Sequence, residues 1–367
     1  MLADNGAEII KIESPDGGDM MRTRAAVRNG ASTSFGQLNL GKKSIVLDLK
    51  QRAAAEVVKR LAGRADIVVE NYRPGVMERL GLAYPTLKSI RPDLIYCAIS
   101  GYGQTGPSSG LPAYAPVIHA ASGYEIAHLS YQEDRSRPDF CGIFFADWLS
   151  GTYAYGAIMT ALYHRAATGE GQMIDVSMFE GMLSMMLTEL TKWQFTVPPA
   201  GRPMFGPVAT GDGWINVAVA SERTFQDLTK AAGHPEWIKD PRFEKYMDRR
   251  ANWHLFIDEL EVWSRALPGS EVKAALDRHG VPCALYRAPD EAFGDPQLVH
   301  RQALVEAHDD GGTFKALNGP FRFTTADARA SDGTRVPSLG EHTEQVLCEG
   351  GFSRDEIAGL RTQGVIV

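Results

Sequence analysis

The sequence predicts an α/β protein with a large domain built on a doubly wound parallel sheet and a smaller α+β domain after it. Hydrophobic strand-like segments alternate with amphipathic helices over the first hundred residues, which is typical of a Rossmann-like sheet. A Pro- and Gly-rich stretch interrupts the chain at 196–210, and a mixture of short helices and strands follows it. The 367 residues, 44% of them hydrophobic, are enough for two cores.

The predicted strands of the sheet cover residues 7–13, 44–49, 66–70 and 94–100. A helix over 51–65 and a short helix that carries Arg79 connect them. In such sheets ligands bind outside the carboxyl ends of the strands. The loops at those ends carry Lys, Arg, Asn and Gly, so cationic side chains and free backbone N–H groups are available there. This combination favours a phosphorylated ligand.

The predicted domain order is a large domain that begins at 1–195, a linker at 196–210, a small domain at 211–288, and a second linker with a return to the large domain at 289–367. Residues 1–4 look like the last turn of a helix that stops at Gly6. A strand and most of a helix are therefore expected to precede this point in a longer protein. The alternative is a short, ordered turn at the N-terminus.

Composition excludes several function classes. A net charge of −7 and a pI near 5.8 give no basis for nucleic-acid binding. The sequence has no apolar run of about eighteen residues, so no membrane span is predicted. Its four cysteines show no metal-ligand spacing, and scattered thiols predict a reducing, cytoplasmic location. No metal site is predicted.

One segment, 144–178, stands out because a single carboxylate, Asp147, opens a helix rich in small residues. The helix is predicted to end at Gly169, and residues 172–178 then alternate like a strand. An acid at the start of a buried helix is either a helix cap or a reactive group in the positive field of the helix. Local sequence alone leaves both interpretations open.

The motifs GAEIIKIESP, GKKSIVLDLK, ADIVVENYRPGVMERLGL, ISGYGQTGP, ADWLSG, ALYHRAATGEGQMIDVSM and PSLGEHT follow one another in order along the chain. This series resembles the class III CoA-transferases of the formyl-CoA transferase and carnitine CoA-transferase type. The resemblance covers nearly the whole chain, and several of its motifs are long.

The resemblance implies a catalytic role for Asp147, which falls on the family's reactive aspartate within Ala146-Asp147-Trp148-Leu149-Ser150-Gly151. Such a carboxylate attacks an acyl-CoA thioester to give a mixed anhydride and then an aspartyl-CoA thioester, which holds CoA until an acceptor acid arrives. The implied substrates are an acyl-CoA and a small carboxylic acid, and no metal is required. The resemblance also implies an interlocked homodimer.

The CoA-binding residues implied by the resemblance follow the strand ends or lie near the reactive aspartate. They are Leu47, Lys50, Asn71, Tyr72, Arg73, Arg79, Arg137 and Met178. Two departures concern CoA binding: the family's first strand and turn would precede Met1, and Ser14 stands where formyl-CoA transferases carry an arginine.

The identity of the two acids stays open. Arg22, Arg24 and Arg137 suggest a dicarboxylic or polar acid, because each could pair with a carboxylate. The Gly-containing segment 201–213 is shorter than the loop that covers the aspartate in formyl-CoA transferases, which argues against formyl-CoA and oxalate as substrates.

Two alternatives remain. One is a 2-methylacyl-CoA racemase, which shares the fold and the aspartate but needs a His-Asp pair where this chain has Tyr114 and Ala115. His119 is expected to be packed rather than catalytic, and Glu341 and His342 are catalytic or loop-closing. The other alternative is a degenerate CoA-binding protein without activity.

Overall fold

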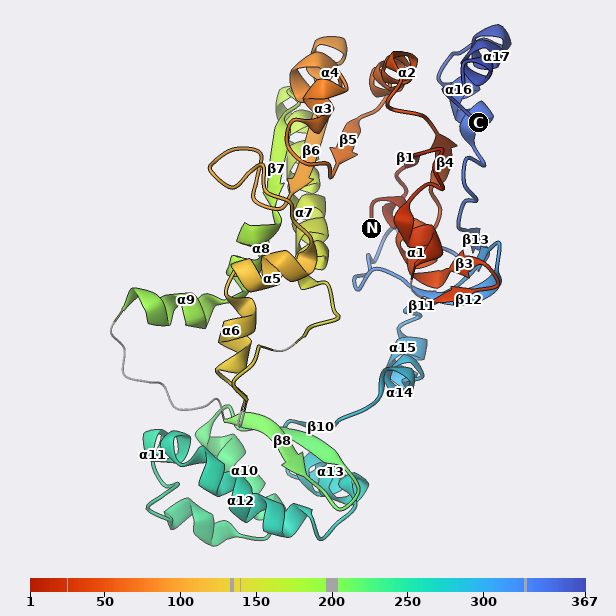
Figure 1. Ribbon diagram of the computed structural model, residues 1–367. Coiled ribbons are helices and arrows are strands. Elements are labelled where there is room, and N and C mark those ends of the chain that lie inside the picture. Colours follow the sequence, from red (N-terminus) through yellow and green to blue (C-terminus); the bar gives the residue numbers. More distant parts are fainter. Residues whose placement is uncertain (25, 133–134, 139, 196–203, 327–328) are drawn as a thin grey trace. The chain divides into compact units, whose positions relative to one another are not determined.

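The computed structural model describes residues 1–24, 26–132, 135–138, 140–195, 204–326 and 329–367. These residues form two compact units (Figure 1). The first consists of Met1–Leu190 and Gln297–Val367, and the second of Thr191–Pro296. All residues that the sequence nominates for the site belong to the first unit, which both ends of the chain build together.

Two parallel sheets form the centre of the first unit. Strand β1 (Ile10–Glu13) pairs with β4 (Lys43–Val46), and β5 (Ile67–Glu70), β6 (Ile95–Ser100) and β7 (Met173–Ser177) pair in that order. The mixed α/β architecture with parallel strands is thus confirmed. The predicted single sheet is instead divided, because among the described residues β1 and β4 pair with each other and β5 pairs with β6 alone.

The connecting helices pack through one apolar face. In α2 (Arg52–Ala62) the buried residues are Ala54, Val57, Val58 and Ala62, at helical spacing. The central strand β6 is buried along most of its length, as expected for a parallel strand covered on both faces. The remaining helices and strands before β6 are η1 (Ala3–Asn5), η2 (Met20–Thr23), β2 (Val27–Arg28), β3 (Ala31–Ser32), α1 (Thr33–Asn39), α3 (Val76–Arg79) and α4 (Tyr84–Ile90).

Most of the expected strands and helices are present, with shorter bounds. Strand β1 begins at Ile10 rather than at residue 7, and residues 3–5 form a 3-10 helix that ends at Gly6 in the left-handed region, with φ of 90°. The helical stretch after β7 is broken near Met186 into α8 (Met178–Met185) and α9 (Leu187–Gln194).

The long helix α7 (Phe145–Thr168) packs through a stripe of small and apolar side chains. Its buried residues are Ala146, Ser150, Ala154, Ile158 and Ala161. Small side chains let the helix approach β6, β7 and α8, which it contacts. Helix α5 (Ala115–Ala121) packs on α7 and α8, and α6 (Tyr124–Leu129) packs on α5.

A close backbone approach directs the chain from α7 into β7. Gly169 ends the helix with φ of 79°, a conformation that glycine adopts without strain. A Cβ at Gly171 would lie 2.3 Å from the backbone of Asp93 and Leu94, so only glycine fits here. These two residues set β7 beside β6, and the residue after β7 begins α8.

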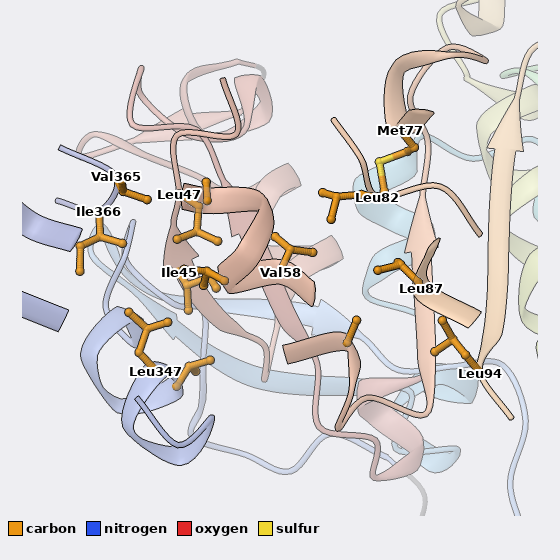
Figure 2. Packing of buried hydrophobic residues seen from close by; sticks show 14 of the residues in the cluster. Ile45, Leu47, Val58, Met77, Leu82, Leu87, Leu94, Leu347, Val365 and Ile366 are labelled. Carbon is orange, nitrogen blue, oxygen red and sulfur yellow. The ribbon is translucent and has the colours of Figure 1, made fainter. Parts of the chain in front are cut away.

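The C-terminal segment returns to the first unit and completes its core. Helices α16 (Thr343–Glu349) and α17 (Arg354–Thr362) contribute Val346, Leu347 and Ile357 to the cluster that also contains Ile45 and Leu94, as Figure 2 shows in part. The C-terminal segment also forms a three-stranded sheet, in the order β12-β11-β13, which packs on α1. Its strands are β11 (Leu304–Asp309), β12 (Gly312–Leu317) and β13 (Thr334–Arg335), and α15 (Pro296–His300) precedes them.

The second unit is a three-stranded antiparallel sheet covered by helices. Residues 205–209 were predicted as linker, and this is wrong, because they form edge strand β8 (Phe205–Ala209); residues 196–203 of that linker lie outside the described part. Pro207 is tolerated because an edge strand needs hydrogen bonds on one side only. The other elements are β9 (Trp214–Ala218), α10 (Glu222–Ala231), η3 (Pro235–Lys239), α11 (Tyr246–Ala251), α12 (Trp253–Ser264), α13 (Gly269–Arg278), β10 (Cys283–Leu285) and α14 (Pro289–Phe293).

Candidate active site

Asp147 lies in the first turn of α7, as its third residue, and does not cap the helix. The N-cap residue is Phe144, which makes no side-chain cap hydrogen bond. Among the described residues, no hydrogen bond or ion pair involves the Asp147 carboxylate. Although the residue is exposed to solvent, burial of its carboxyl by surrounding protein atoms raises the pKa, and the nearby His119 offsets this only in part.

The capping role belongs to His119 of α5. Its Nε2 accepts a hydrogen bond of 3.2 Å from the backbone N–H of Ala146, one of the N–H groups that a helix start leaves unpaired. The ring is fully buried, and burial lowers the pKa of His119. The sequence suggested a packed histidine but not this cap, because the residue lies far from Ala146 along the chain.

An apolar cluster joins Met178 to the turn that carries Asp147. The cluster contains Ala146 of α7, Met178 and Met182 of α8, and Ala115 and Ile118 of α5. Because β7 runs parallel to β5 and β6, Met178 also follows the carboxyl edge of that sheet. Met178 thus packs against Ala146, the neighbour of Asp147, which agrees with the predicted proximity of Met178 to that aspartate.

The turn after β5 presents cationic side chains at the same sheet edge. Arg73 and Arg79 are exposed, and neither has an ion-pair partner among the described residues. The Arg79 guanidinium lies over the backbone of Gly75, where a Cβ would be 3.3 Å from it. Glu70 fixes the turn by accepting the backbone N–H of Tyr72 at 2.8 Å.

Asn71 and Tyr72 are also exposed in this turn. Burial raises the pKa of the Tyr72 phenol, and the nearby Glu70 raises it further. Burial likewise raises the pKa of Glu70, partly offset by the hydrogen bond from the Tyr72 N–H. Tyr72 thus stays a neutral phenol with a partly open ring, which suits contact with a planar base.

Leu47 and Lys50, which follow β4, differ in exposure. Leu47 is 1% exposed and belongs to the main apolar cluster, so its side chain is not available to a ligand (Figure 2). Any contact from Leu47 to CoA would come from its backbone. Lys50 is open to solvent, and within the described part of the chain it forms one ion pair, with Asp16 at 3.5 Å, which joins two exposed side chains and is weak.

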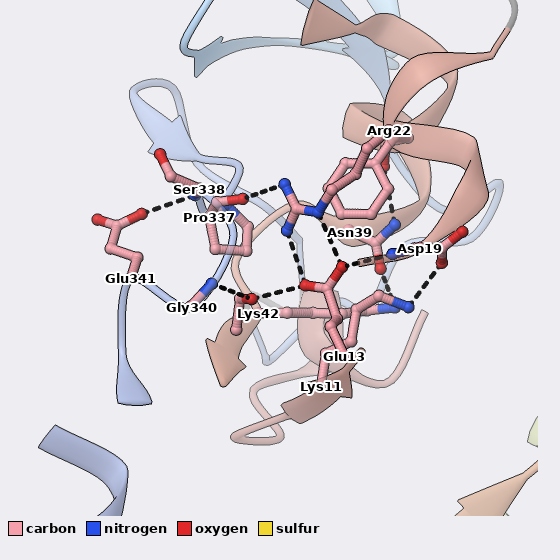
Figure 3. Close-up of polar contacts among 12 residues, drawn as sticks. Lys11, Glu13, Asp19, Arg22, Asn39, Lys42, Pro337, Ser338, Gly340 and Glu341 are labelled. Carbon is pink, nitrogen blue, oxygen red and sulfur yellow. Dashed lines mark hydrogen bonds and ion pairs between the residues drawn. The ribbon is translucent and has the colours of Figure 1, made fainter. Parts of the chain in front are cut away.

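Of the arginines suggested for a substrate carboxylate, Arg22 is already engaged. It donates to both oxygens of the buried Glu13, at 2.8 and 2.7 Å, and to the carbonyl of Pro337 (Figure 3). A substrate carboxylate cannot take this fork without breaking the pair. Arg24 and Arg137 are exposed, with Arg137 in the loop before α7.

The PSLGEHT segment closes the edge of β4. His342 accepts the Ser44 N–H with Nδ1 and donates its own backbone N–H to the Ser44 carbonyl, while Thr343 Oγ1 accepts the Val46 N–H. Glu341 accepts the backbone N–H of Ser338. The His342 and Thr343 groups take the place of hydrogen bonds that a neighbouring strand would supply to β4, and Glu341 closes the turn that begins at Ser338, which agrees with the loop-closing alternative.

The described residues contain no group of three or more His, Cys, Asp or Glu side chains placed to hold a metal. None of the helices in the same ranges is long and apolar enough to span a membrane. The cytoplasmic location stays a prediction.

Comparison with known proteins settles the family. The profile of "CoA-transferase family III" matches residues 1–343. The chain belongs to this family. Over its whole length it is 32% identical to a succinyl-CoA–D-citramalate CoA-transferase of Chloroflexus aurantiacus, covering 93% of that protein. It is also 30% identical to a succinate–glutarate CoA-transferase of Agrobacterium fabrum, over 95% of this chain and 90% of the other.

The fold agrees with this assignment. A solved structure of a CaiB/BaiF family protein from Brucella suis superposes with a TM-score of 0.81 at 32% identity, over 95% of this chain and 93% of that chain. The protein is therefore an enzyme, a family III CoA-transferase. A racemase is not favoured: the relatives above are named transferases, and Tyr114 and Ala115 stand where racemases need a His-Asp pair.

Proposed function

We propose that the protein moves coenzyme A from an acyl-CoA thioester to a carboxylic acid through covalent intermediates on Asp147. The observation that carries this proposal is the isolated carboxylate at the start of α7. It is open to solvent, and no described donor hydrogen-bonds to it. A carboxylate that serves as a cap or ion-pair partner would have its lone pairs occupied, whereas this one can attack.

The proposed reaction exchanges one thioester for another. An Asp147 oxygen attacks the thioester carbonyl and expels the CoA thiolate, which leaves a mixed anhydride. The thiolate then attacks the aspartyl carbonyl, which releases the first acid as a carboxylate and leaves an aspartyl-CoA thioester. The acceptor carboxylate repeats both steps in reverse order, and the new acyl-CoA leaves with Asp147 restored.

Arg73 and Arg79 are proposed to bind phosphate groups of CoA, with Asn71 and Tyr72 beside them. Both arginines are exposed and without ion pairs in the described part of the chain, so binding an anion requires no existing pair to break. The turn follows β5, at the sheet edge where Met178 follows β7. Lys50, Arg137 and the backbone at Leu47 remain proposed further contacts.

Arg79→Gln and Arg73→Gln are each expected to raise the KM for acyl-CoA by about tenfold or more, because each removes charge-assisted hydrogen bonds to phosphate. The kcat at saturating acyl-CoA and the KM for the acid should change little. Arg354→Gln, which removes an exposed arginine of α17, is the control. If the variants left the KM for acyl-CoA unchanged, this turn would not bind CoA.

We further propose that at least one of the two acids is a dicarboxylate longer than oxalate. Both relatives described above are named for a succinyl or succinate group together with citramalate or glutarate. Arg24 and Arg137 remain available for a second carboxylate, whereas Arg22 does not.

A panel of acids that differ in chain length and in number of carboxylates tests the substrate class. Succinyl-CoA would be incubated with glutarate, malate, oxalate and butyrate, and new thioesters would be identified by mass spectrometry. Transfer to glutarate or malate with little transfer to butyrate is expected. Efficient transfer to butyrate alone would contradict the dicarboxylate proposal, and CoA binding without any transfer would indicate an inactive binding protein.

The protein is also proposed to act as a homodimer, interlocked as the family resemblance implies. Within the first unit, the outer face of α7 exposes Trp148 and Tyr163, at 62% and 79%, and a Cβ at Gly151 or Gly156 would meet nothing within 4 Å. Large exposed aromatic side chains beside glycines are typical of a surface that a partner covers.

Light scattering during size exclusion is expected to give twice the mass of one chain down to nanomolar concentration. An interlocked pair cannot separate without opening its rings, so unfolding and dissociation should coincide at every dilution. A folded, active monomer obtained by dilution alone would rule the interlocked dimer out.

A further inference from the structure

His119 is a buried polar side chain next to Asp147 that packing alone does not explain. It is fully buried, yet its Nδ1 has no hydrogen-bond partner among the described residues. An unpartnered buried polar atom is costly, and an apolar side chain of the same size would avoid that cost. The other nitrogen, Nε2, is occupied by the Ala146 N–H.

The hydrogen bond from Ala146 defines the chemical state of the ring. An N–H group can only donate, so Nε2 must be the unprotonated nitrogen and Nδ1 must carry the proton in the neutral ring. Protonation of Nε2 would place two donors against each other and break the cap. Burial disfavours the charged form as well and lowers the pKa of His119.

The ring is held in one orientation by aromatic neighbours. Tyr124 of α6 and Phe145 of α7 lie with ring centroids 5.8 and 6.0 Å from His119. Charged groups reach it from two elements, Glu125 on α6 and Asp147 on α7. The α8 residues of the adjoining cluster, Met178, Phe179 and Met182, do not titrate.

We propose that His119 is a positioning residue for CoA transfer: as a neutral imidazole it fixes the first turn of α7 through Ala146 and leaves the adjacent Asp147 carboxylate free of hydrogen bonds. This proposal rests on Asp147 being the nucleophile. If Asp147 supplied its own cap, its lone pairs would face the helix N–H groups instead of the thioester. His119 does not touch the reacting atoms; it acts through the helix start.

Three substitutions separate the cap from simple packing. His119→Gln can place its side-chain carbonyl where Nε2 is, so the Ala146 N–H keeps an acceptor; His119→Asn is too short to reach it, and His119→Leu has no acceptor. With succinyl-CoA and glutarate, kcat is expected to fall about 100-fold in the Asn and Leu variants, as for a misplaced reacting group, and by no more than about fivefold in the Gln variant. The KM for succinyl-CoA should stay within about threefold.

The pH profile adds a readout that packing would not affect. The wild type should lose kcat as His119 is protonated at acidic pH and the cap breaks, whereas the Gln variant should retain kcat to lower pH, until Asp147 itself is protonated. Equal kcat in the Leu and wild-type enzymes, or equal losses in the Gln and Leu variants, would overturn the proposal.

The tautomer is a direct test that needs no activity. In the ¹⁵N-histidine spectrum of the wild-type protein near neutral pH, with the His119 signal identified by its absence from the Gln variant, the expected pattern is a protonated Nδ1 and a bare Nε2. A protonated Nε2 would overturn the proposal. Because this readout is independent of the nucleophile, a correct tautomer together with an active Asp147→Ala variant would show that the proposed function, and not the cap, is wrong.

Discussion

An Asp147→Ala variant is expected to lose CoA transfer by about 10⁴-fold or more, because the covalent route has no other carboxylate in place of the missing one. Asp147→Asn should lose nearly as much, since an amide is a poor nucleophile of the same shape. Steady-state transfer from succinyl-CoA to glutarate is the measurement, with CoA binding measured separately to confirm that the variants still bind.

Glu180 supplies the matched control for this pair. It is the third residue of α8, as Asp147 is of α7, and it is exposed. Its helix is capped by Ser177, which accepts the Glu180 N–H. Glu180→Gln should therefore keep its activity. Transfer by Asp147→Ala at a rate near that of the wild type would remove Asp147 from the mechanism.

Asp147→Asn should not destabilise the fold. Burial raises the pKa of Asp147 above its usual value of 3.8, so its stabilising contribution is complete below that pH and is lost as the pH rises through the folded-state pKa. At neutral pH the ionised carboxylate therefore opposes folding slightly, and Asp147→Asn is expected to melt at the same temperature or a higher one. This is the usual trade between stability and activity at a reactive group.

Arg22→Ala is expected to lower the free energy of unfolding of the first unit by about 3–5 kcal/mol, because it leaves the buried Glu13 charge without its main partner. The Glu13 side chain is 1% exposed and that of Arg22 is 15% exposed. Glu13 also accepts hydrogen bonds from the Ser44 hydroxyl and from the backbone N–H of Asp19. The Gly340 N–H in turn donates to the Ser44 hydroxyl (Figure 3). Chemical denaturation at fixed protein concentration measures the loss.

Lys11→Ala is the control for this change. It removes the neighbouring ion pair with Asp19, whose side chains are 23% and 26% exposed, and should cost about 1 kcal/mol or less. The double variant Glu13→Leu with Arg22→Met should lose less than the sum of the single changes, since it leaves no unpaired charge. A cost for Arg22→Ala as small as that of Lys11→Ala would contradict the structural role assigned to the pair.

Lowering the pH should weaken the stabilisation that the Glu13–Arg22 pair provides. Burial alone would raise the pKa of Glu13, but hydrogen bonds from Arg22, Ser44 and the Asp19 N–H outweigh it and hold the pKa below its usual value of 4.5. The contribution of Glu13 to stability is therefore complete above that pH and is lost as the pH falls through the lower folded-state pKa. In Arg22→Ala this acid-dependent loss should begin at higher pH.

Much of the fold could be predicted from the sequence because hydrophobic spacing reports local structure. The apolar stripes of α2 and α7 and the hydrophobic run of β6 are visible in the sequence and correspond to buried faces. The division into two parallel sheets could not be predicted, since strand pairing depends on contacts between distant residues. Strand β8 was missed because its Gly206 and Pro207 are typical of loops, whereas an edge strand accepts both.

The candidate site shows the same limit. Asp147 could be nominated because it lies inside a motif. The alternative that it caps the helix is wrong, because His119 accepts the hydrogen bond of the helix start. Arg22 could not be excluded from sequence, because its partner Glu13 is recognisable only once the loop between them has folded. Likewise, His342 resembles a catalytic histidine until its hydrogen bonds to Ser44 are seen.

Chemical trapping on the wild-type enzyme tests the covalent role of Asp147 most directly. The enzyme would be incubated with succinyl-CoA and hydroxylamine, digested, and mapped by mass spectrometry, with Asp147→Asn and an incubation without succinyl-CoA as controls. The expected result is a hydroxamate on Asp147 alone, formed only when succinyl-CoA is present, with parallel loss of activity. Continued transfer without modification of Asp147, or modification of a different carboxylate, would contradict the aspartyl mechanism.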